Sequence, residues 1–431
     1  MIDPGIALET TLRDRVVPEQ GRIPAFIFSD PTIYRVELER IFQRVWLFVA
    51  HVSEVPQRGD YVKRNMGEQT VIVAHGEDDM VRVFLNYCRH RGMELCRSEL
   101  GNTSHFRCPY HGFTYSYTGA LTGVPFQREA YVEGLERSAL SLVEARVEMY
   151  QGLIFATWTL DGPSLHEYLG DIAWYLDVLV GRAEMEVVGP PQRWRVPTGW
   201  KLPSENFCSD AYHTAHTHAS IVKLDLITGG TSFGASGYHV HSQNGHGLGL
   251  GTQAGADPPY PPEMRAEFEQ RLSAPQLALL DRLKNLHGNV FPNLSFLIPT
   301  AIHLEGREVW STTLRLWQPR SVDSTEVVSW CLVEKNAPDW WKRLSRQSYI
   351  ETFGISGMFE QDDTENWESM TRNSRGALSR NGETDLNYTM GIGRAPMQDF
   401  AGPGVVYDGK YSEENARRFY RTWLDYMVAG S

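Results

Sequence analysis

The sequence has few cysteines, no long apolar run and no excess of positive charge. Five cysteines among 431 residues are too few for a disulfide scaffold, so metal binding or simple burial better explains their thiols. No segment approaches the ~18 consecutive apolar residues of a transmembrane helix. The N-terminus shows no export signal, so we expect a cytoplasmic protein. Lysine and arginine number 41 against 53 aspartates and glutamates, which argues against nucleic acid or a membrane surface as a partner.

The spacing of apolar residues changes along the chain. Short alternating segments between residues 58 and 158, such as 70–74 and 81–85, predict a small antiparallel β domain. Longer mixed segments follow and predict an α+β domain, which ends in a helix after Ser412. We therefore divide the chain into an N-terminal helical segment that packs on the larger domain, a β domain and the larger domain, with the boundaries 1–40, 41–160 and 161–431.

Two mixed pairs of cysteine and histidine lie in the predicted β domain. Cys88 and His90 form a C-x-H motif, and after a gap of 17 residues Cys108 and His111 form C-P-Y-H-G. Two cysteines and two histidines could hold one zinc ion, although common zinc fingers group like ligands together. Mixed pairs suit a two-iron cluster in which one iron binds both thiolates and the other binds both imidazoles.

These two motifs resemble the Rieske [2Fe–2S] motif. The resemblance implies that Cys88, His90, Cys108 and His111 bind one such cluster. The chain departs from the usual pattern at Phe113, where tryptophan commonly follows C-P-Y-H-G, and this difference is expected to alter only the packing beside the cluster.

A second group of candidate metal ligands comprises Asp210, His213, His216 and His218. If the segment were one helix, Asp210, His213 and His216 would share a face. His213 and His218 would instead point about 140° apart. Helical spacing alone therefore favours the first three residues.

Another acidic segment, residues 357–367, reads G-M-F-E-Q-D-D-T-E-N-W. Two imidazoles and one carboxylate would leave three positions open at iron(II) for oxygen and water. Chemistry alone does not separate the adjacent Asp362 and Asp363 as the source of that carboxylate.

Both segments resemble the large (α) subunit of Rieske non-haem iron aromatic ring-hydroxylating dioxygenases. The match of D-x-x-H-x-x-x-x-H implies that His213 and His218 bind the iron, and the acidic segment implies Asp363 as the third ligand. A wide turn or a helix break near Ala215 would be needed to bring both imidazoles to one metal.

The resemblance also implies roles for residues beside the iron. Asp210 would bridge a cluster imidazole of one subunit to an iron-binding imidazole of the next, and Asn206 would lie near the iron without binding it. His216 is then a pocket or surface residue.

The resemblance covers nearly the whole chain and implies an α+β fold. A Rieske domain with an antiparallel β-sheet, preceded by the helical segment, would join a catalytic domain with a large antiparallel sheet flanked by helices. The implied activity is cis-dihydroxylation of a hydrophobic aromatic hydrocarbon with O2, with electrons delivered from NADH through a reductase and a ferredoxin. Three α subunits would assemble, with or without three small β subunits.

Other functions remain open at this point. A Rieske monooxygenase or demethylase would use the same two sites. A Rieske electron carrier would need the first site alone, and a zinc hydrolase would contain no iron.

Apolar residues near the iron motifs are candidates for the substrate pocket. No lysine or arginine lies inside those motifs, which favours an uncharged arene. We expect the Gly-rich tract 229–255 to be a loop over the entrance. The expected lining residues are Phe207, Phe353, Met358, Phe359, Phe291 and Leu297.

Overall fold

The computed structural model divides the chain into two compact units. The smaller unit spans Phe42–Leu165, and the larger one joins Met1–Ile41 to His166–Ser431. The structure describes residues 4–208, 210–224, 226, 237–253, 260–299, 301–381 and 384–429.

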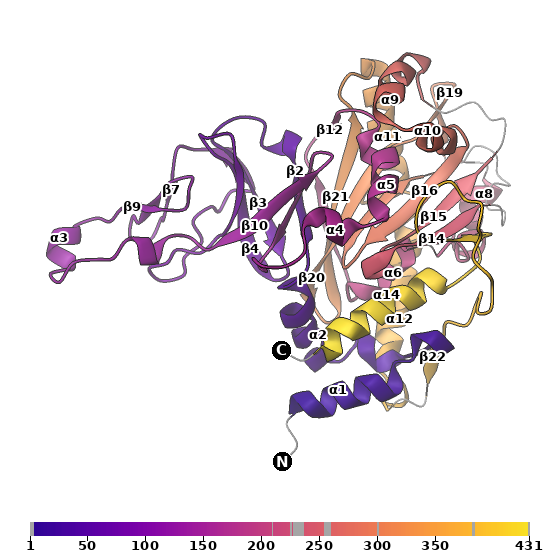
Figure 1. Ribbon diagram of the computed structural model, residues 1–431, viewed down its shortest axis with the longest axis horizontal. Helices are drawn as coiled ribbons and strands as arrows, with labels where there is room; N and C mark the ends of the chain where they lie inside the picture. The colour runs from indigo at the N-terminus through magenta and orange to yellow at the C-terminus, as the bar shows by residue number, and fades with distance from the viewer. Residues whose placement is uncertain are drawn as a thin grey trace. The chain divides into compact units, whose positions relative to one another are not determined.

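The smaller unit is built on a seven-stranded antiparallel sheet with the order β2-β11-β10-β5-β4-β3-β6 (Figure 1). The two strands predicted from alternating apolar residues are confirmed as β4 and β5, which pair with Val71 opposite Leu85. A separate three-stranded sheet, β7-β8-β9, carries the second Cys/His loop. The strand bounds are β2 Leu47–His51, β3 Asp60–Met66, β4 Gln69–His75, β5 Val81–Leu85, β6 Leu100–Asn102, β7 Phe106–Arg107, β8 Thr114–Tyr115, β9 Leu121–Gly123, β10 Glu144–Tyr150 and β11 Leu153–Thr157.

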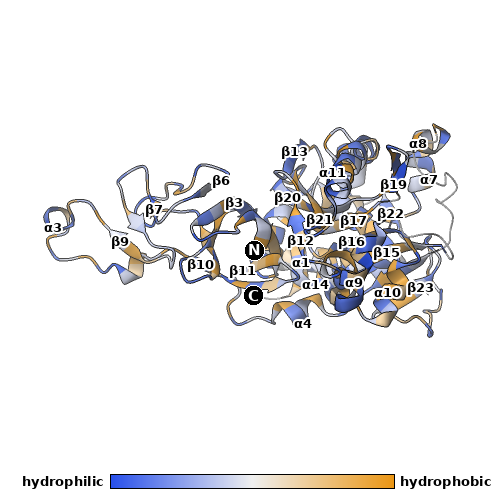
Figure 2. Ribbon diagram, turned by 90° about the horizontal axis from the view of Figure 1, so that it is seen from above, coloured by the Kyte–Doolittle hydropathy of each residue, from blue (hydrophilic) through white to orange (hydrophobic). Residues whose placement is uncertain are grey.

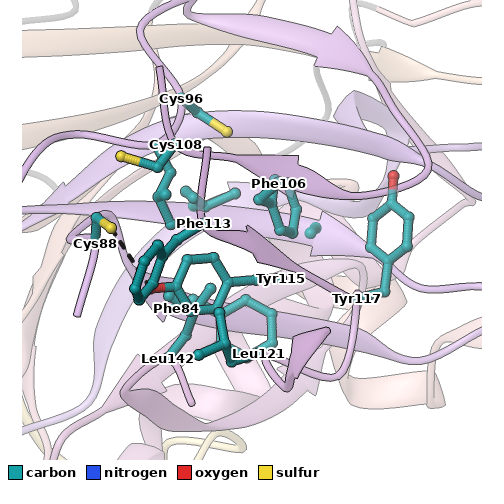
Figure 3. Packing of buried hydrophobic residues seen from close by; sticks show 13 residues of the cluster. Phe84, Cys88, Cys96, Phe106, Cys108, Phe113, Tyr115, Tyr117, Leu121 and Leu142 are labelled. Carbon is teal, nitrogen blue, oxygen red and sulfur yellow. Dashed lines mark hydrogen bonds between the residues drawn. The ribbon is translucent and has the colours of Figure 1, made fainter. Parts of the chain in front are cut away.

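Two of the predicted cluster ligands belong to the apolar core of this unit. Cys88 and Cys108 are 1% and 3% exposed and pack with Phe113 and Tyr115. Figure 3 shows both sulfurs at the same edge of this core, whereas the Cys96 side chain points away from them. The core therefore holds two thiols side by side.

The larger unit contains a nine-stranded antiparallel sheet, so the predicted α+β fold is confirmed. Its order is β12-β21-β20-β17-β16-β15-β14-β23, and β13 also pairs with β21. The strands carry much of the hydrophobic colouring in Figure 2, and every residue of β17 is buried. The bounds are β12 Met185–Val187, β13 Gln192–Val196, β14 Tyr238–His241, β15 Gly247–Thr252, β16 Leu283–Val290, β17 Leu294–Ile298, β20 Thr312–Ser321, β21 Ser324–Glu334 and β23 Val405–Asp408.

The Gly-rich tract 229–255 is only partly described, and the described part corrects its prediction as a loop. It forms β14 and β15, which pair with Val240 opposite Leu248 inside the large sheet. Residues 229–236 and 254–255 lie outside the described residues. Glycines at alternate positions of β15 misled the sequence analysis, because their role is to admit neighbouring side chains.

Four helices of the larger unit bear on the site: α6 Lys201–Phe207, α11 Asp339–Phe353, α12 Glu360–Ser374 and α14 Glu414–Val428. The predicted C-terminal helix is confirmed as α14, which packs on α6, β14 and β15. Ser412 Oγ accepts the N–H of Glu414 at 3.2 Å, although the N-cap position itself is Glu413, whose side chain makes no capping bond. None of the helices within the described ranges has the length and apolar composition needed to span a bilayer.

Candidate metal centres and the adjoining cavity

The two Cys/His loops of the smaller unit repeat one backbone pattern. In the first, Cys88 N–H donates to Met93 O at 2.9 Å and Gly92 N–H donates to Cys88 O at 2.8 Å. The equivalent bonds donated by Cys108 and Gly112 measure 2.8 and 3.0 Å. Gly92 and Gly112 have φ values of 77° and 74°, which glycine adopts most easily. Each cysteine is therefore held in a tight loop of the same shape.

The two histidines lie outward of the buried sulfurs. The His90 and His111 rings are 4.5 Å apart, and His90 stacks on Phe113 at 4.6 Å. His111 is exposed and His90 is half-buried. Phe113, the departure from the usual motif, thus packs directly against a predicted ligand.

The environment of these donors fits a [2Fe–2S] cluster. Burial raises the pKa of the Cys108 thiol, the N–H groups of Tyr110 and His111 lower it, and the neighbouring Cys88 raises it. Those N–H groups would stabilise a thiolate bound to iron. Within the described part of the chain, the buried Nδ1 of His90 has no hydrogen-bond partner.

In the larger unit, His213, His218 and Asp363 converge on one point. Their ligand atoms lie within 4.8 Å of one another, and both imidazole Nε2 atoms lie 3.3 Å from Asp363 Oδ1. Asp363 Oδ1 is buried and accepts no hydrogen bond of normal geometry from the described residues. Three donors that meet without bonding one another fit a metal ion held by two histidines and one carboxylate.

The chain brings the two histidines together by interrupting the helix. A single helical turn, α7 Thr214–Thr217, separates them, with His213 at its N-cap and His218 at its C-cap. His218 has φ −99° and ψ 24°, so the helix breaks at His218. The sequence analysis had expected the break near Ala215, which instead lies inside α7. With both histidines at the ends of one turn, the angle calculated for a continuous helix no longer applies.

The trio favoured by helical spacing does not form. His216 is exposed and lies outside the convergent group, because α7 begins after Asp210 and spans only one turn. The sequence pattern was right about the residue types and wrong about this geometry.

Carboxylates also face the outer nitrogens of both imidazoles. Asp362 Oδ2 lies 3.2 Å from His218 Nδ1, and Asp210 Oδ2 lies 3.3 Å from His213 Nδ1. Such contacts fix the ring orientation and the tautomer that presents Nε2 to a metal. The structure thus separates the adjacent acids, with Asp363 at the convergence point and Asp362 behind His218.

Asp210 is held by its own loop and by α6. Its Oδ1 accepts the N–H groups of Tyr212 and His213 at 3.1 and 3.3 Å, and Asn206 Nδ2 lies 3.3 Å from its Oδ2. In the isolated chain 39% of the Asp210 side chain is exposed. Asp210 therefore contacts His213 on one side and is accessible on the other.

A cavity of about 90 Å³ adjoins the three convergent residues. Phe353 stacks on Phe359 at 5.0 Å, and Phe359 meets the His218 ring edge-on at 4.9 Å, so an aromatic wall stands beside the metal site. The lining residues are Asn206, Phe207, Asp210, Ala211, His213, Thr214, His218, Asn285, His287, Leu297, Pro299, Phe353, Phe359, Asp363 and Lys410.

Four of the six predicted pocket residues line this cavity: Phe207, Leu297, Phe353 and Phe359. Met358 and Phe291 are not among its described lining residues. Phe291 is fully buried elsewhere, stacked on Tyr426 at 5.8 Å, because the turn after β16 points it toward α14.

The sequence analysis missed the polar side of the cavity. Asn285 and His287 lie two residues apart on β16 and so share one face of the strand. The alternation of side chains along a strand could have revealed this pair in the sequence. Lys410 follows β23 and lies far from both iron motifs in sequence. The iron motifs contain no basic residue, as the sequence analysis noted, but Lys410 lines the cavity from outside them, so that absence does not favour an uncharged substrate.

Comparisons with known proteins agree with this architecture. Residues 45–145 match the Rieske [2Fe-2S] domain, and residues 165–429 match the ring hydroxylating alpha subunit (catalytic domain). Naphthalene 1,2-dioxygenase from Rhodococcus sp., solved with indole bound, is 44% identical, with a TM-score of 0.94 and 100% of each chain covered.

Two curated relatives differ from each other in their named activities. Biphenyl dioxygenase subunit alpha of Paraburkholderia xenovorans (strain LB400) is 36% identical over 96% of this chain and 93% of its own. N,N-dimethyl phenylurea N-demethylase subunit alpha of Sphingobium sp. (strain YBL2) is also 36% identical, over 94% and 91%.

Proposed function

This chain belongs to the ring-hydroxylating α subunits, which are Rieske oxygenases that carry a [2Fe–2S] cluster and a mononuclear iron. From that membership we propose that it cis-dihydroxylates an aromatic hydrocarbon framework. The observation that carries the proposal is the convergence of His213, His218 and Asp363 beside an aromatic-walled cavity. An arene, O2, two electrons and two protons would give one dihydrodiol, and both oxygen atoms would enter the product.

His213, His218 and Asp363 would hold the iron, and Cys88, Cys108, His90 and His111 would hold the cluster. The cluster supplies single electrons, and a ferrous ion with this ligand set keeps positions open for O2. Asp362 and Asp210 would keep the two iron-binding imidazoles turned inward by accepting hydrogen bonds from their Nδ1–H groups.

The aromatic wall would orient the substrate ring. Phe353 and Phe359 are stacked with an interplanar angle of 7°, and Phe207 lies 6.4 Å from Phe353. Offset or edge-on contacts with these rings are each worth roughly 0.5–1.5 kcal/mol beyond burial. An arene held there lies beside the convergent ligands, with water displaced from that side.

Electrons would reach this site from NADH through a reductase and a ferredoxin, and a cytoplasmic location suits that supply. Asp210 contacts His213 and keeps an accessible side, which supports a role as the bridge to the cluster imidazole of a neighbouring subunit. We propose an assembly of three α subunits, with or without three small β subunits.

N-demethylation is the second candidate activity, because one relative of equal identity is named as a demethylase subunit. The donor set suits both reactions. The two activities differ in how many atoms of O2 enter the product.

The test is turnover by the purified oxygenase with reductase, ferredoxin, NADH and ¹⁸O2, using naphthalene as the two-ring probe. We expect a cis-dihydrodiol labelled at both oxygens. A singly labelled ring alcohol would reject dihydroxylation. Loss of N-methyl groups from an N,N-dimethyl phenylurea supplied in a parallel reaction, without ring oxidation of naphthalene, would favour the second candidate.

A further inference from the structure

One lysine lies inside the substrate cavity, where the proposed reaction has no use for it. Lys410 is 7% exposed and lines the same cavity as the iron-binding trio. His287 lines this cavity too, and its pKa is lowered to about 3 by burial first and then by the charges of Lys410, His239 and His213. The lysine and the metal site are therefore near neighbours within one cavity.

The fold provides a slot for this side chain. Gly409 N–H donates to Gly237 O at 2.9 Å and fixes the backbone just before Lys410. A Cβ at Gly237 would lie 2.9 Å from Lys410 Cε, and a Cβ at Gly251 would lie 2.8 Å from Lys410 Nζ. Two glycines thus leave open the path that the lysine follows from the edge of the sheet to the cavity.

The Gly251 position shows where the ammonium group ends. The same Cβ would lie 2.7 Å from Asn285 Oδ1, so the ammonium and the Asn285 amide flank one point on β15. Asn285 and His287 also line the cavity, and together with Lys410 they form its polar end.

Lys410 has no anionic partner among the residues that the structure describes. No ion pair or hydrogen bond connects it to any of them, and burial is the one cause that lowers its pKa. A buried charge without a partner is costly. Other buried bases of this chain form ion pairs with a buried carboxylate: Lys201 with Glu37, Arg182 with Glu334 and Arg315 with Glu360. Lys410, which has no such pair within the described ranges, faces the substrate cavity.

We propose that Lys410 is a specificity-determining residue that binds a carboxylate on the aromatic substrate. The inference rests on the proposed function and narrows its substrate class from arenes in general to arenes that carry an acidic group. The aromatic wall would hold the ring, and Lys410 with the Asn285 amide would hold the carboxylate at the polar end. The substituent would thereby decide which ring edge faces the iron.

Binding to the resting oxygenase tests this without turnover. Equilibrium dialysis would compare naphthalene-2-carboxylate, naphthalene and 2-naphthol on the wild type and on Lys410→Met, which keeps an unbranched side chain, one atom shorter, and removes its charge. Hydrogen bonds to charged groups are the stronger ones, so we expect Lys410→Met to bind the carboxylate at least about tenfold more weakly and naphthalene within about twofold of the wild type.

Three further variants control for folding and charge. Lys284→Met removes an equal charge from β16 outside the cavity lining, and Lys410→Arg keeps the charge in the cavity, so both should retain the preference for the carboxylate. Gly251→Ala keeps Lys410 but crowds its ammonium, and should weaken carboxylate binding selectively. Iron content and the visible spectrum of the cluster establish that each variant is intact.

The inference is overturned if Lys410→Met weakens both ligands equally, if it leaves carboxylate binding unchanged, or if 2-naphthol binds the wild type more tightly than the carboxylate. Dihydrodiol formation from naphthalene with no preference for the carboxylate would sustain the proposed reaction and reject this inference. A carboxylate preference that depends on Lys410, without any ring oxidation, would sustain this inference and reject the proposed reaction.

Discussion

Two adjacent carboxylates should differ sharply in their effect on iron binding. Asp363→Asn removes the negative charge of the buried carboxylate on whose Oδ1 both Nε2 atoms converge at 3.3 Å, so we expect the iron to be lost on gel filtration. Asp362→Asn removes only the negative charge of the acceptor behind His218 Nδ1. Loss of such an orienting partner weakens metal affinity by roughly 10–100-fold. The Asp362 side chain is 34% exposed, so water can replace it, which places its effect near tenfold, about 1.4 kcal/mol.

The assay is ferrous titration of each chelator-treated variant, with the visible spectrum of the cluster as a check on folding. Glu365→Gln, an exposed charge change on the same helix, should bind iron like the wild type. The reasoning fails if Asp362→Asn loses iron as completely as Asp363→Asn, or if Asp363→Asn retains it.

Three other changes address separate parts of the molecule. Asp210→Ala should keep both metal centres but lower NADH-dependent turnover at least a hundredfold; near-normal product formation would reject Asp210 as the bridge. Gly112→Ala forces a residue with a side chain to φ 74° and places its Cβ 3.0 Å from Pro125. We therefore expect about 1–2 kcal/mol of destabilisation and a weaker cluster absorbance. The control Gly134→Ala, with φ 90° and no neighbour within 4 Å, should leave the cluster intact. His246 is buried between Tyr168 O and Phe291 N–H, and burial lowers its pKa to about 4. Because the unfolded chain takes up this proton first as the pH falls below about 6.5, the free energy of unfolding should fall by about 2 kcal/mol between pH 7 and pH 5. Urea unfolding of His246→Gln should show a flatter dependence on pH.

The sequence predicted the metal-binding residue types well because ligand chemistry restricts them. Cysteine and histidine in mixed pairs, and two histidines with a carboxylate, are few enough in kind to be recognised at their spacing. The α+β fold also followed from the change in periodicity near residue 162. The geometry of His213 and His218 did not follow, because it combines a helix that ends at His218 with a contact between His218 and α12, more than a hundred residues later.

The pocket was predicted only where it adjoins the motifs. Phe207 and Phe359 are sequence neighbours of predicted iron-site residues and do line it, whereas Phe291, chosen for its apolar surroundings, lies in the core against Tyr426. An apolar strand residue looks the same in sequence whether its face meets a cavity or a helix.

Lys410 was missed because the sequence analysis looked for pocket residues only near the iron motifs. It reaches the cavity from the end of β23, and its path depends on the absence of side chains at Gly237 and Gly251 on other segments. A lysine in a surface-like Gly-Lys-Tyr context has no sequence feature that marks it as buried. The iron ligands are restricted by their metal and so leave a pattern, whereas a residue that selects the substrate needs only to reach the cavity and can come from any segment the fold brings there. In this enzyme the reaction could therefore be inferred from short motifs, but the substrate class had to be inferred from the three-dimensional structure.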